Sequence, residues 1–246
     1  MKREFVKTSN SKLFRSHIAQ AMARGARESS LVAVTGRPGE GKTITLQNWS
    51  SENGGVMLTA QVDWTPRRML VDLAEKLHID PTSGFERRME AFIAAKDISV
   101  IVDEAGFTLT NNAICLERLR GITDKSSTLL VLVFMPHDIN RLDVPRLKQL
   151  RDRISTTCDF KKSTLEDVVQ ACNQLAEVPI APDLAAFILA QTEGCMRLVM
   201  NTISRVEGFA RLREGELRNA PVNLNDIKGL DLFKGLGRAG RKGAAA

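Results

Sequence analysis

The stretch GRPGEGKT, residues 36–43, constrains the fold more than any other part of the chain, and it directly follows the apolar run LVAVT. It matches the pattern G-x-x-x-x-G-K-T, in which a glycine-rich turn connects a buried strand to a helix. The glycines let the backbone curl around phosphate oxygens, so that N–H groups and the helix N-terminus point at them. The pattern predicts a nucleotide-binding loop formed by Gly36, Arg37, Pro38, Gly39, Glu40, Gly41, Lys42, Thr43 and Ile44.

Two side chains of this loop have specific expected roles. Lys42 is expected on the β- and γ-phosphates, and the hydroxyl of Thr43 is expected to ligate Mg²⁺. A chance match on a glycine-rich turn is the alternative, but the strand before the loop and the helix after it are the context that the motif requires. ATP and Mg²⁺ are therefore the expected cofactors. The loop alone does not distinguish a kinase, a GTPase, a helicase and a molecular switch.

A second motif, ISVIVDEAG at residues 98–106, is an apolar strand that ends in two carboxylates. Asp103 fits the second carboxylate of a magnesium site, and Glu104 can polarise an attacking water as a general base. A solvated acidic loop is the alternative, which the phosphate-binding pattern about 60 residues earlier makes the weaker interpretation. The pair predicts an ATPase, because it favours hydrolysis over phosphoryl transfer to a small acceptor.

Two arginine-containing segments carry weaker signals. The segment RLKQLRDRIS, residues 146–155, precedes a strand, and Arg153 first or Arg151 second could reach the γ-phosphate of a neighbouring subunit as an arginine finger. Spacing alone favours a solvated helix face over this role. Gly194 and Arg197 form G-x-x-R at a helix start, from which Arg197 could contact the nucleotide, although a solvated arginine fits the same pattern.

The order of elements predicts an α/β fold with two domains. Strands alternate with helices as far as residue 160, which implies a parallel sheet with helices on both faces. From STLEDVVQACNQLAEV onward the pattern is all-helical, and Ser163 with Glu166 is the expected capping box. The predicted organisation is an αβα core over residues 1–160, a small helical lid domain over 161–235 and a flexible basic tail over 236–246.

Composition narrows the classes of function. The sequence has no run of 18 apolar residues for a membrane span, its N-terminus lacks the apolar region of a secretory signal, and its four cysteines show no C-x-x-C spacing. A cytoplasmic protein fits these features. The net charge of +6 suits a partner with a phosphate backbone, and equally an ordinary basic protein. Tyrosine is absent and aromatics make up 5%, so contacts with nucleic acid are expected to be ionic.

In this order the motifs resemble those of the AAA+ ATPases. GRPGEGKT is similar to their Walker A segment, IVDEAG to Walker B, LRDRI to the arginine-finger region and GCMR to sensor 2. More narrowly, FVKTSNSKLFRSHIAQAMARG and TPRRMLVDLAEKLHI resemble segments of the transposition ATPases, the Mu phage B protein (MuB) with its TniB and TnsC relatives. The resemblance covers roughly residues 4–210.

The resemblance implies a function. It implies ATP-dependent binding of double-stranded DNA without much sequence preference, filaments or rings of the protein on that DNA, and delivery of target DNA to a transposase that it activates. The protein would then act in DNA transposition and recombination, in a bacterial or phage-infected host cytoplasm. Arg67 and Arg68 lie where these relatives place a DNA-facing helix, although a solvated helix start is the equal alternative. An AAA+ switch or loader that acts on protein partners without binding DNA is the alternative function.

Two features depart from the family pattern. The sensor 1 position, at the end of the strand LLVLVFM, usually carries a polar residue, but Met135 stands there, with His137, Asp138 and Asn140 nearby. The chain also has no room for the additional N-terminal DNA-binding domain of the Mu protein. Contacts with DNA are therefore expected from the ATPase domain and the basic tail.

Overall fold

The computed structural model describes residues 1–23, 31–109, 113–212, 220–228 and 232. The chain divides into two compact units, an α/β unit of residues 13–37 and 42–160 and a helical unit of residues 1–12, 38–41 and 161–246. The predicted core was one continuous segment, 1–160. In the structure, the first twelve residues and the tip of the glycine-rich loop group with the helical unit instead. The predicted basic tail, 236–246, lies outside the described residues.

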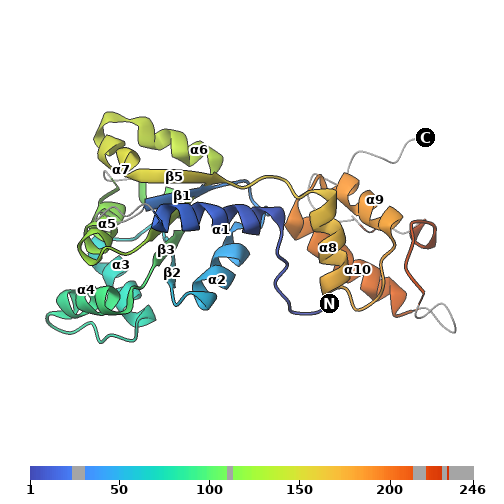
Figure 1. Cartoon of the computed structure of the whole chain (residues 1–246), viewed down its shortest axis with the longest axis horizontal. Coiled ribbons are helices and arrows are strands. Elements are labelled where there is room, and N and C mark those ends of the chain that lie inside the picture. Colours follow the sequence, from blue (N-terminus) through green and yellow to red (C-terminus); the bar gives the residue numbers. More distant parts are fainter. Residues whose placement is uncertain (24–30, 110–112, 213–219, 229–231, 233–246) are drawn as a thin grey trace. The chain divides into compact units, whose positions relative to one another are not determined.

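A five-stranded parallel sheet forms the centre of the α/β unit (Figure 1). The strand order is β2-β3-β4-β1-β5. Because all strands are parallel, their carboxyl ends lie at the same edge, where ligands bind in open α/β sheets. The predicted parallel α/β sheet is confirmed. The strands are β1 (Leu31–Thr35), β2 (Val56–Thr59), β3 (Val100–Asp103), β4 (Leu130–Phe134) and β5 (Ile154–Asp159).

Helices cover both faces of this sheet. Along β1, Val32 and Val34 pack in one apolar cluster with residues of α1 and α2, whereas Leu31 and Ala33 belong to a second cluster with residues of α3, α4, α5 and α7. This alternation follows from the two-residue period of a strand. The helices of this unit are α1 (Ser9–Met22, whose first turn groups with the helical unit), α2 (Lys42–Glu52), α3 (Pro66–Lys76), α4 (Phe85–Lys96), α5 (Ile114–Ser126), α6 (Pro136–Ile139) and α7 (Lys148–Asp152).

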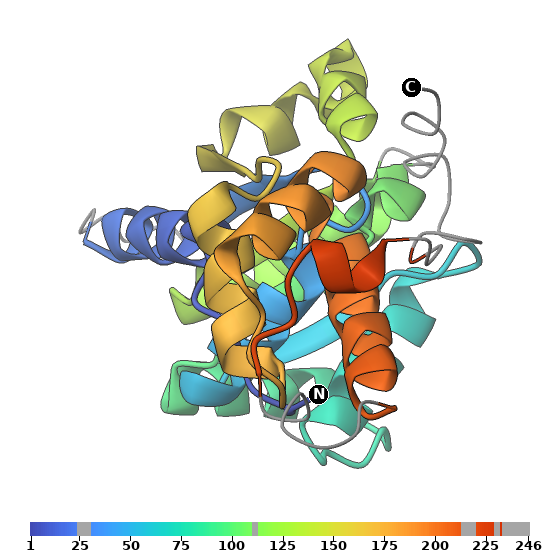
Figure 2. The ribbon, with the colours of Figure 1, turned by 90° about the vertical axis from the view of Figure 1, so that its right-hand side faces the viewer.

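The helical unit is built on α8 (Leu165–Leu175), α9 (Pro182–Thr192) and α10 (Met196–Ala210), which Figure 2 shows in yellow-orange to orange tones. They enclose their own apolar core, to which Met1 and Val6 of the N-terminal segment also pack. One isolated parallel bridge, between Ile180 and Val222, interrupts the otherwise helical pattern. None of the described helices is both long and apolar enough to cross a lipid bilayer.

The capping box of α8 is formed by Thr164 and Asp167, so the predicted pair Ser163 and Glu166 was wrong. Thr164 has an extended backbone, its hydroxyl accepts from the Asp167 N–H at 3.2 Å, and its own N–H donates to the Asp167 carboxylate at 3.0 Å. The sequence STLED offers two hydroxyl–acid pairs with the same spacing. The structure selects the second pair because Asp167 is also held by the backbone N–H and hydroxyl of Ser9, each at 2.6 Å.

Candidate nucleotide site

The base of the glycine-rich loop is fixed by its own lysine. Lys42, the first residue of α2, is 8% exposed, and its ammonium donates to the carbonyl oxygens of Gly36 at 2.5 Å and Arg37 at 2.9 Å. A buried ammonium needs such partners. The side chain thus lies within the turn that the backbone makes between β1 and α2, which is where the motif predicts contacts with phosphate.

The structure brings together the two predicted magnesium ligands. The Thr43 hydroxyl donates to the Asp103 carboxylate at 2.7 Å, although 60 residues separate them. Thr43 lies in the first turn of α2, and Asp103, 4% exposed, ends β3. A hydroxyl beside a carboxylate at this edge is a set of oxygen donors that Mg²⁺ accepts together with phosphate oxygens and water. These two residues therefore fit the predicted cation.

Glu104 follows Asp103 in an unusual backbone conformation. Its φ is +54°, in the left-handed region that residues other than glycine seldom adopt. Its N–H donates to the Asp103 carboxylate at 2.9 Å, and its carbonyl accepts from the Phe107 N–H at 3.1 Å. The turn thus places a second, half-buried carboxylate directly beside the first. The arrangement suits a general base that acts next to a cation site.

The tip of the loop, residues 38–41, bonds to other residues of the helical unit. The Gly39 carbonyl accepts from the Arg197 N–H at 3.1 Å, and the Glu40 carbonyl accepts from the side-chain amide of Asn10 at 3.2 Å. Gly39 has φ +84°, and a Cβ atom at this position would lie 2.5 Å from the sulfur of Cys195. Glycine is therefore required there both by the backbone and by the approach of Cys195.

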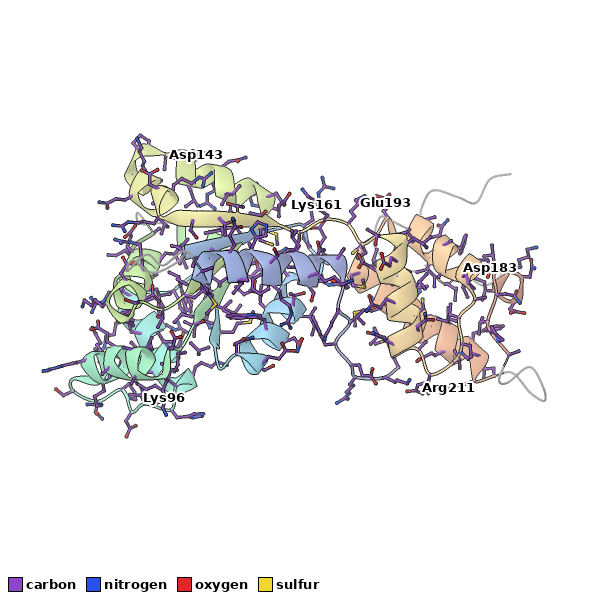
Figure 3. All side chains as sticks on the ribbon, viewed as in Figure 1. Lys96, Asp143, Lys161, Asp183, Glu193 and Arg211 are labelled. Atoms are coloured by element: carbon purple, nitrogen blue, oxygen red, sulfur yellow. The ribbon has the colours of Figure 1, made fainter. Side chains whose placement is uncertain are left out.

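Asn10 is a residue of this region that the sequence did not indicate. Its side chain is buried, donates to the Lys161 carbonyl at 2.7 Å and accepts from the Lys161 N–H at 2.9 Å, in addition to its bond with Glu40. Lys161 lies on the segment that joins β5 to α8, where Figure 3 labels it. Asn10, Glu40 and Lys161 are far apart in the chain, and no local spacing pattern could connect them.

The G-x-x-R segment acts partly through its backbone. Gly194 has φ +73°, and a Cβ there would lie 2.7 Å from the Ser163 carbonyl, so this glycine is needed for packing inside the helical unit. Arg197 contacts the loop tip through its N–H, and its side chain is exposed near the start of α10. The role of its guanidinium on a nucleotide remains a prediction.

The remaining predicted arginines lie on exposed parts of the α/β unit. Arg151 forms an ion pair with Asp143 at 3.3 Å near α7, and Arg153 is exposed between α7 and β5. Arg67 and Arg68 are exposed in the first turn of α3, where Arg68 pairs with Asp63. The roles of these four arginines stay predictions.

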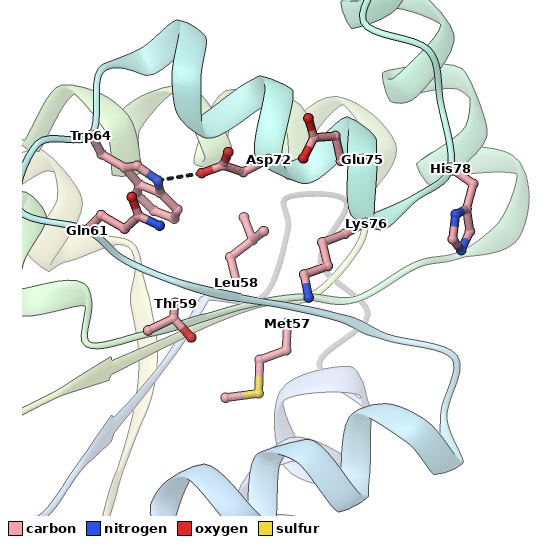
Figure 4. A pocket seen from close by; sticks show the side chains of 9 residues that line it. All are labelled: Met57, Leu58, Thr59, Gln61, Trp64, Asp72, Glu75, Lys76 and His78. Atoms are coloured by element: carbon pink, nitrogen blue, oxygen red, sulfur yellow. Dashed lines mark hydrogen bonds between the residues drawn. The ribbon is translucent and has the colours of Figure 1, made fainter.

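A separate cavity of about 510 Å³ lies beside β2, the edge strand of the sheet (Figure 4). The indole N–H of Trp64 donates to Asp72 at 2.7 Å on its wall. None of the predicted nucleotide-site residues lines this cavity, so it is distinct from the loop. The lining consists of Met57, Leu58, Thr59, Gln61, Trp64, Asp72, Glu75, Lys76 and His78.

The family and curated-sequence comparisons find no match for this chain. Its fold, in contrast, is similar to that of solved proteins. A mutant RuvB from Thermotoga maritima aligns at 18% identity and a TM-score of 0.62 over 94% of this chain and 71% of RuvB. Cdc6p from Pyrobaculum aerophilum aligns at 16% and 0.64 over 85% of this chain and 65% of its own. Aeropyrum pernix ORC1, solved in complex with DNA, aligns at 18% and 0.59 over 90% and 64%.

The chain therefore shares the α/β fold of these solved proteins, with a parallel five-stranded sheet. The chain spans about two thirds of the length of these solved structures. At 16–18% identity the similarity establishes architecture alone. The three structures are of RuvB, Cdc6 and ORC1, so the narrower resemblance to transposition ATPases stays a prediction.

Proposed function

We propose that this chain is an ATPase that binds double-stranded DNA in an ATP-dependent manner, with little sequence preference, and delivers target DNA to a transposase. The observation that carries the ATPase part is the arrangement of Lys42, Thr43 and Asp103 at the carboxyl edge of a parallel sheet. Glu104 beside them supplies the group that hydrolysis needs.

Each residue of the proposed site has a separate role in ATP hydrolysis. In the ATP-bound protein the Lys42 ammonium exchanges its carbonyl partners for phosphate oxygens, which carry more negative charge. Thr43 and Asp103 would hold Mg²⁺, which would supply positive charge next to the phosphates. Glu104 orients the attacking water and accepts its proton. Arg153, with Arg151 as the second candidate, stabilises the transferring phosphoryl group from a neighbouring subunit.

The DNA-binding part rests on charge. The net charge is +6, and Arg67 and Arg68 are exposed on α3. Contacts from such side chains to phosphates give sequence-independent binding that weakens steeply with salt. The solved ORC1 neighbour was determined in complex with DNA. Filament or ring assembly and the transposase partner are supported by the resemblance of the motif-bearing segments to transposition ATPases.

The test is polarisation of a labelled duplex of arbitrary sequence, titrated with protein in ATP and in ADP. We expect ATP to raise the affinity and Lys42→Ala to abolish the increase. Arg67→Ala with Arg68→Ala should reduce the slope of log affinity against log salt by about 2, or about 1 per lost phosphate contact. Arg87→Ala with Lys96→Ala, on α4, is the matched control. Equal affinity in ATP and ADP would contradict the proposal.

The alternative is an ATPase switch that acts on protein partners. The pairing of Arg68 with Asp63 favours it, because an ion pair lowers the positive charge that α3 presents to DNA. Absence of duplex binding at low salt, together with ATP hydrolysis, would support this second function.

A further inference from the structure

The turn after β3 contains a left-handed residue, Glu104, whose conformation requires support from neighbouring groups. Glu104 has φ +54°, and a non-glycine residue keeps this strained conformation only where the surrounding structure imposes it. Before the turn, the bond from the Glu104 N–H to Asp103 provides one restraint. After it, the Phe107 N–H donates to the Glu104 carbonyl at 3.1 Å, and a second place where the turn is held lies at Gly106.

Asp138 lies at that second place. It belongs to α6, which follows the carboxyl end of β4, and it is 6% exposed. Its carboxylate is packed directly against the Cα of Gly106, because a Cβ atom on Gly106 would lie 2.0 Å from Oδ2 and 2.5 Å from Cγ. Gly106 has no left-handed φ. This glycine is therefore required by the approach of Asp138 and not by its own backbone.

Arg141 fixes the carboxylate in this position. Its Nη1 lies 2.8 Å from Oδ1 of Asp138 and also approaches the Gly106 carbonyl oxygen at 3.4 Å. Burying a carboxylate is costly unless it is paired and hydrogen-bonded, and Arg141 supplies this pairing. His137 also lies near Asp138, with its Nε2 3.5 Å from Oδ1. Asp138 and Arg141 together hold Gly106 from its Cα and from its carbonyl.

We propose that Asp138 is a positioning residue for ATP hydrolysis, which clamps Gly106 with the help of Arg141 and so keeps Glu104 in place beside Asp103. This inference rests on the proposed ATPase activity. It assigns a role to a polar residue of α6, just after β4. Met135 stands at the position where the AAA+ ATPases, which the motifs resemble, usually carry a polar side chain. Asp138 acts through the turn and not on the nucleotide, so it should govern turnover and leave ATP affinity alone.

The experiment measures kcat, KM and the affinity for a fluorescent ATP analogue in Asp138→Asn, Gly106→Ala and the double variant. A displacement of about 1 Å at a catalytic group lowers a rate by roughly 100-fold. We therefore expect each single variant to lower kcat about 10- to 100-fold, with the analogue affinity within about twofold of wild type. The double variant should lose less than the product of the two single losses, because both substitutions disturb the same contact.

Asp124→Asn is the matched control, since Asp124 also pairs with an arginine, Arg120, at 2.7 Å within a helix of the same unit. We expect it to keep the wild-type kcat. Wild-type kcat in both Asp138→Asn and Gly106→Ala would overturn the inference, as would equal losses of kcat and nucleotide affinity, which indicate general disruption. Absence of turnover in the wild-type protein would instead refute the proposed ATPase function, and the inference with it.

Discussion

The base and the tip of the glycine-rich loop are held in contrasting ways. At the base, Lys42 bonds carbonyls five and six residues away, and Thr43 meets Asp103 of the other motif. At the tip, Gly39 and Glu40 bond residues 158 and 30 positions away in the chain, Arg197 and Asn10. The base is thus defined by the motifs themselves, whereas the tip is defined by the fold of the helical unit. The comparison predicts that base and tip variants fail for different reasons.

The largest effect is expected from Lys42→Met, which removes the ammonium and preserves most of the side-chain volume. Loss of one charge-stabilising donor in an active site lowers turnover by about 10²–10³-fold. We expect that loss in steady-state ATPase assays, with a weaker affinity for ATP. Lys125→Met, at an exposed lysine paired with Glu90, is the control and should keep wild-type turnover. Wild-type hydrolysis in Lys42→Met would contradict the role assigned to Lys42 at the base of the loop.

A smaller but still large effect is expected from Gly39→Ala at the tip. The left-handed φ costs an alanine about 1–2 kcal/mol, and the clash with Cys195 adds about 1–3 kcal/mol of overpacking. Gly54→Ala is the matched control, because Gly54 has φ +65° with no atom within 4 Å of a Cβ. Denaturant titration should show Gly39→Ala as the more destabilised variant, and Cys195→Ala should recover part of the difference. Equal losses at both glycines would show that Cys195 does not constrain the tip.

The next effect concerns Asn10→Asp, which removes both amide donations and places a carboxylate against the carbonyls of Glu40 and Lys161. A buried polar group left without its partner costs about 1–3 kcal/mol. We expect this loss in the free energy of unfolding. Asn53→Asp is the control, because Asn53 is exposed and donates a single side-chain bond, to Trp49 at 2.8 Å. A variant as stable as wild type would show that the tip does not depend on Asn10.

The smallest expected effect is a pH dependence of the stability that Asp167 gives to the helical unit. Burial alone would raise the pKa of Asp167, but hydrogen bonds from Ser9 and Thr164 outweigh it and lower the pKa below the ordinary 3.8. The stabilisation is therefore complete above the ordinary pKa and is lost as the pH falls through the folded value. Asp167→Asn should lower the melting temperature at pH 7, and the difference should shrink below pH 3.8.

Glu166→Gln is the control for that measurement. Glu166 is exposed and takes no part in the capping box. We expect a melting temperature close to that of wild type at every pH. A pH-independent difference between Asp167→Asn and wild type would contradict the role of the ionised Asp167.

The sequence allowed prediction of the fold and of the motif residues, but not of their supports. Alternating apolar strands and helices predict the parallel sheet because each element has its own period. The motif spacing predicts Lys42, Thr43 and Asp103 near one another because both motifs end parallel strands. Asn10, Cys195 and the Asp138 clamp depend on contacts between distant segments, which no local pattern encodes. The capping box was predicted wrongly because two pairs with the same spacing fit the pattern, and the bonds from Ser9 to Asp167 favour the second pair.

The bonds between Ser9 and Asp167 also set an order of events during synthesis. These partners are 158 residues apart, and ribosomes add about 5–20 residues per second, so Ser9 waits roughly 8–30 s for its partner to be made. The α/β unit ends at residue 160, so all of its residues have been added to the chain just before Asp167 is made. Ser9 can therefore bind Asp167 only after every residue of the α/β unit has been made.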